Sequence, residues 1–76
     1  MKNILETVIL NLVENKEAVE IKEINEEKST VFEVRVADGD MGRIIGKQGR
    51  LAKSIRTLMK AFATKEQKKV SVEFIG

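Results

Sequence analysis

The sequence predicts an α+β domain in which three helices cover one face of a three-stranded mixed sheet. Apolar residues recur at helical spacing in some stretches and alternate with polar residues in three others. The predicted order is helix, strand, strand, short helix, long helix, strand. A right-handed crossover through the two later helices makes the second and third strands parallel if they are neighbours. The length suits one small domain, so we expect residues 1–76 to form a single unit.

The first helix is expected at residues 2–14, where apolar side chains recur at alternating intervals of one and three residues. This spacing places them on one broad face: Ile4, Leu5, Val8, Ile9, Leu12 and Val13. Leu10 falls on the opposite, polar side. There it is either a solitary exposed leucine, which is common, or part of a contact surface.

Three stretches have the two-residue period of a half-buried strand: residues 18–24, 30–37 and 70–74. The first two flank a short polar turn and are expected to pair as an antiparallel hairpin. Ile24 is out of phase with Val19 and Ile21, which indicates either a bulge or the end of the first strand.

Two helices are expected between the second and third strands. Asp40 is a plausible N-cap for a short one at residues 41–45, because its carboxylate can accept hydrogen bonds from the free amides of a first turn. A long one is expected from about Gly49 to Thr64. Its apolar and basic side chains occupy separate arcs: Leu51, Ile55, Leu58, Met59 and Phe62 on one side, and Arg50, Lys53, Arg56 and Lys60 on the other.

Charge is unevenly distributed along the chain. Residues 1–40 hold five basic and ten acidic residues, a net charge of −5, whereas residues 41–65 hold seven basic residues and no acidic one. A basic patch of this kind suits a phosphate polymer as the binding partner.

The composition removes several classes of function. The chain has no His and no Cys, so it lacks imidazole bases, thiol nucleophiles, disulfides and the usual zinc ligands. We therefore expect neither an enzyme nor a bound cofactor, metal or small-molecule substrate. No apolar run approaches the ~20 residues that cross a bilayer, and the N-terminus lacks the pattern of a signal peptide. We expect a cytoplasmic location and no membrane partner.

The segment Gly46-Lys47-Gln48-Gly49 joins the two later helices. Gly46 can adopt the left-handed conformation that ends a helix, and Gly49 allows the chain to bend without a Cβ in the way. The start of the next helix offers free amides and a partial positive charge, to which Lys47 and Arg50 add mobile cations. By itself the turn is either a bare helix corner or an anion site. The absence of nearby acids and the separate basic arc favour a phosphate.

The segment Ile45-Gly-Lys-Gln-Gly-Arg50, followed on the helix by Ile55, resembles the KH signature Ile-Gly-x-x-Gly before a helix. KH modules hold about four nucleotides with this loop. The element order, with an extra helix and strand at the start, resembles the type II KH fold. The stretch from Asp40 to Arg56 is similar to the KhpA family of single-domain bacterial KH proteins. Ala52 stands where many KH domains have Ile, but this family commonly has Ala.

The resemblance implies single-stranded RNA as the ligand. Lys47 and Gln48 would meet the sugar-phosphate path, and basic side chains would border it. Bases would lie in a groove formed by apolar residues and the strand end at residues 34–36. Periodicity alone also fits Ile45 and Ile55 to the core, and it places all three phenylalanines there, so no aromatic stacking platform is expected. The implied RNA-binding set is Arg43, Ile44, Ile45, Gly46, Lys47, Gln48, Gly49, Arg50, Ala52, Lys53, Ile55 and Arg56.

The resemblance also implies protein partners: a second copy of the chain, a larger KH-containing protein of the KhpB/Jag type, or both. The implied role is that of an RNA chaperone or post-transcriptional regulator. Two alternatives stay open. The chain could act mainly as a dimerisation module, with Leu10 and the apolar flank of the long helix as contacts. It could also bind single-stranded DNA, because phosphate contacts do not separate DNA from RNA.

Overall fold

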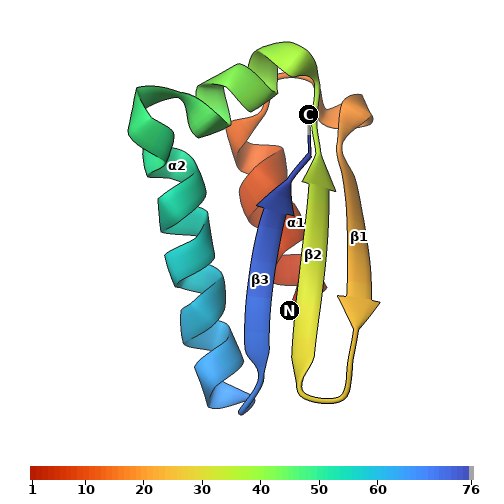
Figure 1. The fold of residues 1–76 in the computed structure, drawn as a ribbon. Coiled ribbons are helices and arrows are strands. Elements are labelled where there is room, and N and C mark those ends of the chain that lie inside the picture. The colour runs from red at the N-terminus through yellow and green to blue at the C-terminus, as the bar shows by residue number, and fades with distance from the viewer. Residues whose placement is uncertain (76) are drawn as a thin grey trace.

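The computed structural model describes residues 1–75. It contains, in order, helix α1 (Lys2–Leu12), a 3-10 turn η1 (Lys16–Ala18), strands β1 (Glu20–Asn25) and β2 (Ser29–Arg35), helix α2 (Asp38–Lys65) and strand β3 (Lys69–Phe74). The strand order is β1-β2-β3, with β1 and β2 antiparallel and β2 and β3 parallel. The predicted α+β class, hairpin and mixed sheet are thereby confirmed. Figure 1 shows α1 behind the sheet and the later part of α2 alongside β3.

The two helices expected before the last strand form the single element α2. Its backbone leaves the helical region only at residues 46–49, so residues 1–75 contain two helices and one 3-10 turn in place of the three separate helices expected. In Figure 1 the green first part of α2 crosses above the sheet, and the teal and blue remainder descends beside β3. In the part of the chain that the model describes, neither helix is long and apolar enough to cross a membrane.

The junction between α1 and α2 differs from the prediction. α1 ends at Leu12, and the backbone N–H groups of Glu14 and Asn15 donate to the carboxylate of Asp40 at 2.9 and 3.0 Å. The expectation that Asp40 caps a helix beginning after it is wrong, because α2 already begins at Asp38. Asp40 instead accepts hydrogen bonds from two backbone amides of the segment that follows α1, which fixes the start of α2 against the end of α1.

The first strand begins later than predicted, because residues 16–18 form the 3-10 turn η1. β1 then runs without interruption from Glu20 to Asn25, and every one of its residues has a partner on β2. Ile24 pairs with Val31 within this register, which excludes a bulge. Since side chains alternate along a strand, Ile24 lies on the face opposite Ile21, away from the core.

The core lies between the two helices and one face of the sheet. Phe32 and Val34 of β2 are fully buried, and their neighbours Val31 and Glu33 on the other face are partly exposed. Both helices contribute to the same cluster, which therefore holds both parts of α2 in fixed positions relative to the sheet. The cluster comprises Leu5, Ile9, Val13, Phe32, Val34, Ile44, Ala52, Ile55, Met59, Ala63, Val70 and Val72.

Candidate nucleic-acid interface

Residues 46–49 make the break in α2. Gly46 is extended, with φ −69° and ψ 174°. Lys47, Gln48 and Gly49 then follow one another in the left-handed region, with φ of 52°, 63° and 72°. The expectation that Gly46 itself is left-handed is wrong. The left-handed turn begins one residue later and includes two residues that carry side chains.

The two glycines of the break differ in backbone conformation, and only Gly49 has one that favours glycine. Gly49 has φ 72°, a conformation that residues with a Cβ adopt at a cost. Gly46 has a backbone conformation open to any residue. A Cβ built on either glycine would meet no atom of residues 1–75 within 4 Å. Within the described chain, neither packing nor backbone geometry therefore requires a glycine at position 46.

Lys47 and Gln48 combine exposure with backbone strain. Both side chains are exposed, and both residues lie in the left-handed region. This conformation costs a residue other than glycine on the order of 1–3 kcal/mol, and such strain is found most often at binding and catalytic sites. The turn therefore presents a lysine and an amide side chain to solvent from two consecutive residues in a conformation that residues with a Cβ adopt rarely.

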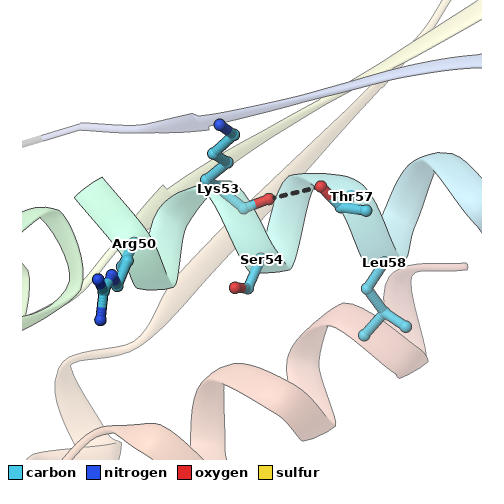
Figure 2. Close-up of a pocket in the computed structure, with 5 residues that line it drawn as sticks. All are labelled: Arg50, Lys53, Ser54, Thr57 and Leu58. Carbon is cyan, nitrogen blue, oxygen red and sulfur yellow. Dashed lines mark hydrogen bonds between the residues drawn. The ribbon is translucent and has the colours of Figure 1, made fainter. Parts of the chain in front are cut away.

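The basic side chains after the break do not form one continuous ridge. Figure 2 shows Arg50 and Lys53 leaving α2 on different sides, with Arg50 on the side of Ser54 and Leu58. These four residues and Thr57 line a recess of about 510 Å³. The hydroxyl of Thr57 donates to the carbonyl oxygen of Lys53 at 2.9 Å. A polymer that leaves the loop along either side of α2 therefore meets a cation.

Arg43, which precedes the loop, is already engaged. Its Nη2 lies 2.7 Å from Oε1 of Glu14, and its Nη1 donates to the carbonyl oxygen of Leu12 at 3.2 Å. The ion pair is solvent-exposed, so it contributes only about 0–1 kcal/mol to stability. Because Glu14 balances its charge, Arg43 should attract a phosphate less strongly than Lys47 or Arg50 does.

The strand that borders α2 is β3. The sequence suggested residues 34–36 as the wall of the groove, but β2 is the central strand and is paired along both edges. β3 is one of the two edge strands, the other being β1, and a groove of about 330 Å³ runs between β3 and α2, lined by Arg56, Lys60 and residues 70–73. Alternation in the sequence identifies both strands, but it does not reveal which one lies at the edge.

The four apolar residues assigned to the groove separate into two groups. Ile44, Ala52 and Ile55 are only 2–3% exposed and belong to the core cluster, so they shape the interface from beneath. Ile45 is 53% exposed and directly precedes Gly46. Periodicity alone allows Ile45 and Ile55 to lie either in the core or in the groove. The structure buries Ile55 in the core and exposes Ile45.

Asp40 anchors the first part of α2 as an ionised group. The hydrogen bonds from the backbone N–H groups of Glu14 and Asn15 lower the pKa of Asp40 below its ordinary value, and the nearby charges of Arg43 and Lys16 act in the same direction. Burial acts against this shift but is outweighed by it. The segment that leads into the loop is therefore held by a carboxylate that stays charged at neutral pH.

The chemistry of this surface is that of a cradle for an anionic chain. It combines a left-handed turn, an uncrowded glycine, exposed cations and an adjacent groove. Over residues 1–75, no group of three acidic side chains is placed to hold a metal ion. The arrangement can bind and orient a phosphate backbone, and it contains no His or Cys that could act on one.

Comparison with known proteins agrees with this geometry. Residues 2–74 match the family model described as "KhpA/KhpB, KH domain". A protein of Clostridium acetobutylicum named "RNA-binding protein KhpA" is 51% identical over 75 residues, which cover 99% of this chain and 100% of that protein. The protein of that name from Caldanaerobacter subterraneus subsp. tengcongensis is also 51% identical over 75 residues, with the same coverage. The one from Chlamydia trachomatis is 43% identical, covering 99% of this chain and 96% of its own.

No solved structure matches the chain significantly. Neither the family description nor the names of these relatives denotes an enzyme. The match spans nearly the whole chain, and the first two relatives share about half of its residues from end to end. The resemblance to KhpA is thereby confirmed: the chain belongs to the KhpA/KhpB family of KH domains.

Proposed function

We propose that this chain binds single-stranded RNA through the loop at residues 46–49 and the groove beside it. One observation carries the proposal: a glycine that nothing in the described chain requires stands directly before two exposed residues with strained backbones, Lys47 and Gln48. A ligand backbone lying against Gly46 gives both features a reason, because an added Cβ would obstruct it. The name that the relatives carry supports RNA as the ligand.

In this proposal the residues of the interface have three roles. Lys47 and Gln48 contact the sugar-phosphate backbone, and Arg50 and Lys53 flank it. Ile45 offers an exposed apolar contact to a base. The remaining members of the set shape or border the site: Gly46 and Gly49 by leaving room, Ile44, Ala52 and Ile55 from the core, and Arg43 and Arg56 at its margins.

The arrangement of elements supports assignment to the type II KH fold. α1 and β1 precede the unit β2-α2-β3, and α2 counts as two helices, one on either side of the loop. We further propose that residues 1–76 act as one KH domain in the cytoplasm, as an RNA chaperone or post-transcriptional regulator. The family description, which joins KhpA with KhpB, supports a partner of the KhpB/Jag type.

The test is the double variant Lys47→Asp/Gln48→Asp. Reversing the charge of the turn places two carboxylates against the phosphates, so affinity for a fluorescein-labelled single-stranded RNA is expected to fall at least about tenfold. Fluorescence anisotropy measures the affinity, and thermal denaturation followed by circular dichroism verifies the fold.

The matched control is Lys2→Asp/Asn3→Asp, which changes the net charge by the same amount. Both residues are exposed and lie at the N-terminus, which Figure 1 shows in the lower half of the view, away from the break in α2 at the upper left. RNA binding that survives in the loop variant, or that falls equally in the control, would contradict the loop as the binding site.

A second function, self-association, is favoured by one apolar surface. Leu58 is 39% exposed, and a hollow of about 210 Å³ lies between α1 and α2, lined by Val8, Leu12, Leu51, Ser54, Ile55 and Leu58. We propose a second copy of the chain as its occupant, because two short RNA sites on one dimer gain affinity through avidity. Leu10, the other contact suggested by the sequence, is half-buried.

Light scattering over a range of concentrations tests this surface. Leu58→Asp is expected to shift a dimer to monomer, since it places a charge in the apolar hollow. Thr64→Asp, an exposed position on the same helix, is the control and should leave the oligomeric state unchanged. A wild-type chain that stays monomeric at every concentration would exclude self-association. Competition between matched RNA and DNA oligomers tests the other alternative, single-stranded DNA.

A further inference from the structure

The guanidinium of Arg56 is held against β3 by two contacts. Its Nε donates to the carbonyl oxygen of Val72 at 2.9 Å. Its central carbon, Cζ, lies 5.5 Å from the centre of the Phe74 ring, within the range of a cation–π contact. An exposed arginine normally samples many rotamers, and these contacts remove much of that freedom.

The two terminal amino groups of Arg56 stay available. Among residues 1–75, Arg56 makes no other side-chain hydrogen bond, and no carboxylate lies within 4.0 Å of its guanidinium. Glu73 lines the same groove without forming an ion pair with Arg56. Arg43 differs in this respect, because both of its terminal nitrogens are engaged by α1 and Glu14.

A guanidinium anchored through Nε presents Nη1 and Nη2 as two parallel donors. This fork fits two neighbouring acceptors on one edge of a partner. Guanine offers O6 and N7, and cytosine offers O2 and N3, whereas adenine places an amino donor beside each ring acceptor on its exposed edges. Uracil separates its two carbonyl oxygens by an N–H donor. The fork therefore distinguishes guanine and cytosine from adenine and uracil.

The position of Arg56 favours a base over a phosphate. Arg56 lies seven residues after Gly49, which is roughly 10 Å along the helix axis. It is therefore separated from the loop at residues 46–49, where the RNA backbone is proposed to bind. It also faces the edge of β3 across the groove that contains Val70 and Val72. In the proposed complex, a strand whose backbone lies at the loop can place a base in this groove, beside Arg56.

We propose that Arg56, positioned by Val72 and Phe74, selects cytosine or guanine over adenine and uracil at the nucleotide between α2 and β3. The inference rests on the proposed function, because it requires RNA to occupy the groove. It adds sequence preference to a loop that contacts only the backbone.

The test uses four fluorescein-labelled heptamers: seven uridines, and the same chain with cytidine, guanosine or adenosine at the centre. Wild type is expected to bind the cytidine and guanosine heptamers at least about 5-fold more tightly than the other two, the lower end for a bidentate contact. Arg56→Lys keeps the charge but removes the fork, so the four affinities should become equal. The ratio of affinities is the readout, since it does not depend on the fraction of folded protein.

Lys60→Gln is the matched control from the same groove. Lys60 has no side-chain hydrogen bond or ion pair among residues 1–75, so Lys60→Gln removes an unoriented charge and should weaken binding of all four heptamers alike and preserve the preference. A wild-type chain that binds all four equally, or an Arg56→Lys variant that retains the wild-type preference, overturns the role of Arg56 and leaves the proposed function standing. Failure of wild type to bind any heptamer overturns both. A change in thermal stability without a change in the ratio shows that Arg56 only covers the edge of β3.

Discussion

Asp40 accepts a hydrogen bond from the backbone N–H of Glu14 at 2.9 Å, across 26 positions of sequence. A second bond, from the N–H of Asn15 at 3.0 Å, completes the pair. The contact connects the end of α1 to the first turn of α2, which leads into the loop at residues 46–49. The geometry of the candidate RNA site therefore depends on an ionised side chain outside it.

Asp40 is expected to make stability depend on pH. The hydrogen bonds from Glu14 and Asn15 lower its pKa in the folded protein, and an aspartate in the unfolded chain has a pKa of about 3.9. Its contribution is therefore complete above that value and is lost as pH falls through the lowered pKa of the folded state. Urea denaturation between about pH 3 and 7 measures the free energy of unfolding of wild type and of Asp40→Asn. The loss of stability in Asp40→Asn should be greatest at neutral pH and should shrink as the pH falls.

Asp38→Asn is the control for this experiment, since Asp38 is an exposed carboxylate in the same turn of α2. The account would be contradicted if Asp40→Asn and Asp38→Asn lost the same stability at every pH.

Alanine substitutions at the two loop glycines should separate folding from binding. Gly49→Ala forces a Cβ into the left-handed region, with φ 72°, and should cost about 1–2 kcal/mol. Gly46→Ala meets no atom of residues 1–75 within 4 Å and should leave stability unchanged or raise it by about 0.4–1 kcal/mol, while weakening RNA binding. Urea denaturation and anisotropy on both variants measure the two effects. A large loss of stability in Gly46→Ala would mean that the fold itself requires this glycine.

The adjacent residues Ile44 and Ile45 offer a matched pair. Ile44 is 2% exposed, so Ile44→Ala should cost about 2–5 kcal/mol. Ile45 is 53% exposed, and Ile45→Ala should change stability by about 0.5 kcal/mol or less while reducing RNA affinity. Both quantities are measured on the same two proteins. Wild-type affinity in Ile45→Ala would remove Ile45 from the interface.

Salt should weaken binding with a slope set by the phosphate contacts. If Lys47, Arg50 and Lys53 each neutralise one phosphate, a plot of log affinity against log salt should have a slope of about −2, at about −0.7 per contact with a single strand. Lys53→Ala should make the slope shallower by about 0.7. Lys22→Ala, an exposed lysine on β1, should leave it unchanged. Equal slopes for wild type and Lys53→Ala would exclude Lys53 as a phosphate contact.

Local pattern was enough to predict most of the fold. Alternation located the second and third strands to within two residues of β2 and β3, and the one-three spacing located α1, because these periods reflect which side of an element is buried. The turn η1 was missed, since three residues are too few to show a period.

The interface was predictable only in part. Glycines, cations and the absence of acids marked residues 46–49 without long-range information. The partners of Asp40, Arg43 and Arg56 lie 16 to 31 positions away in sequence, and no local pattern reveals them. The extended conformation of Gly46 was missed because Lys47 and Gln48 adopt the left-handed conformation that propensity favours for glycine.

The most direct test of the account is nuclear magnetic resonance titration of the ¹⁵N-labelled chain with a short single-stranded RNA. If RNA binds at the loop, the largest chemical-shift changes are expected at the backbone amides of residues 45–50. Smaller changes are expected at Lys53 and Arg56, and little change is expected on β1. Shifts confined to α1 or to the open face of the sheet, with residues 46–49 unperturbed, would contradict the central claim that this loop holds the RNA.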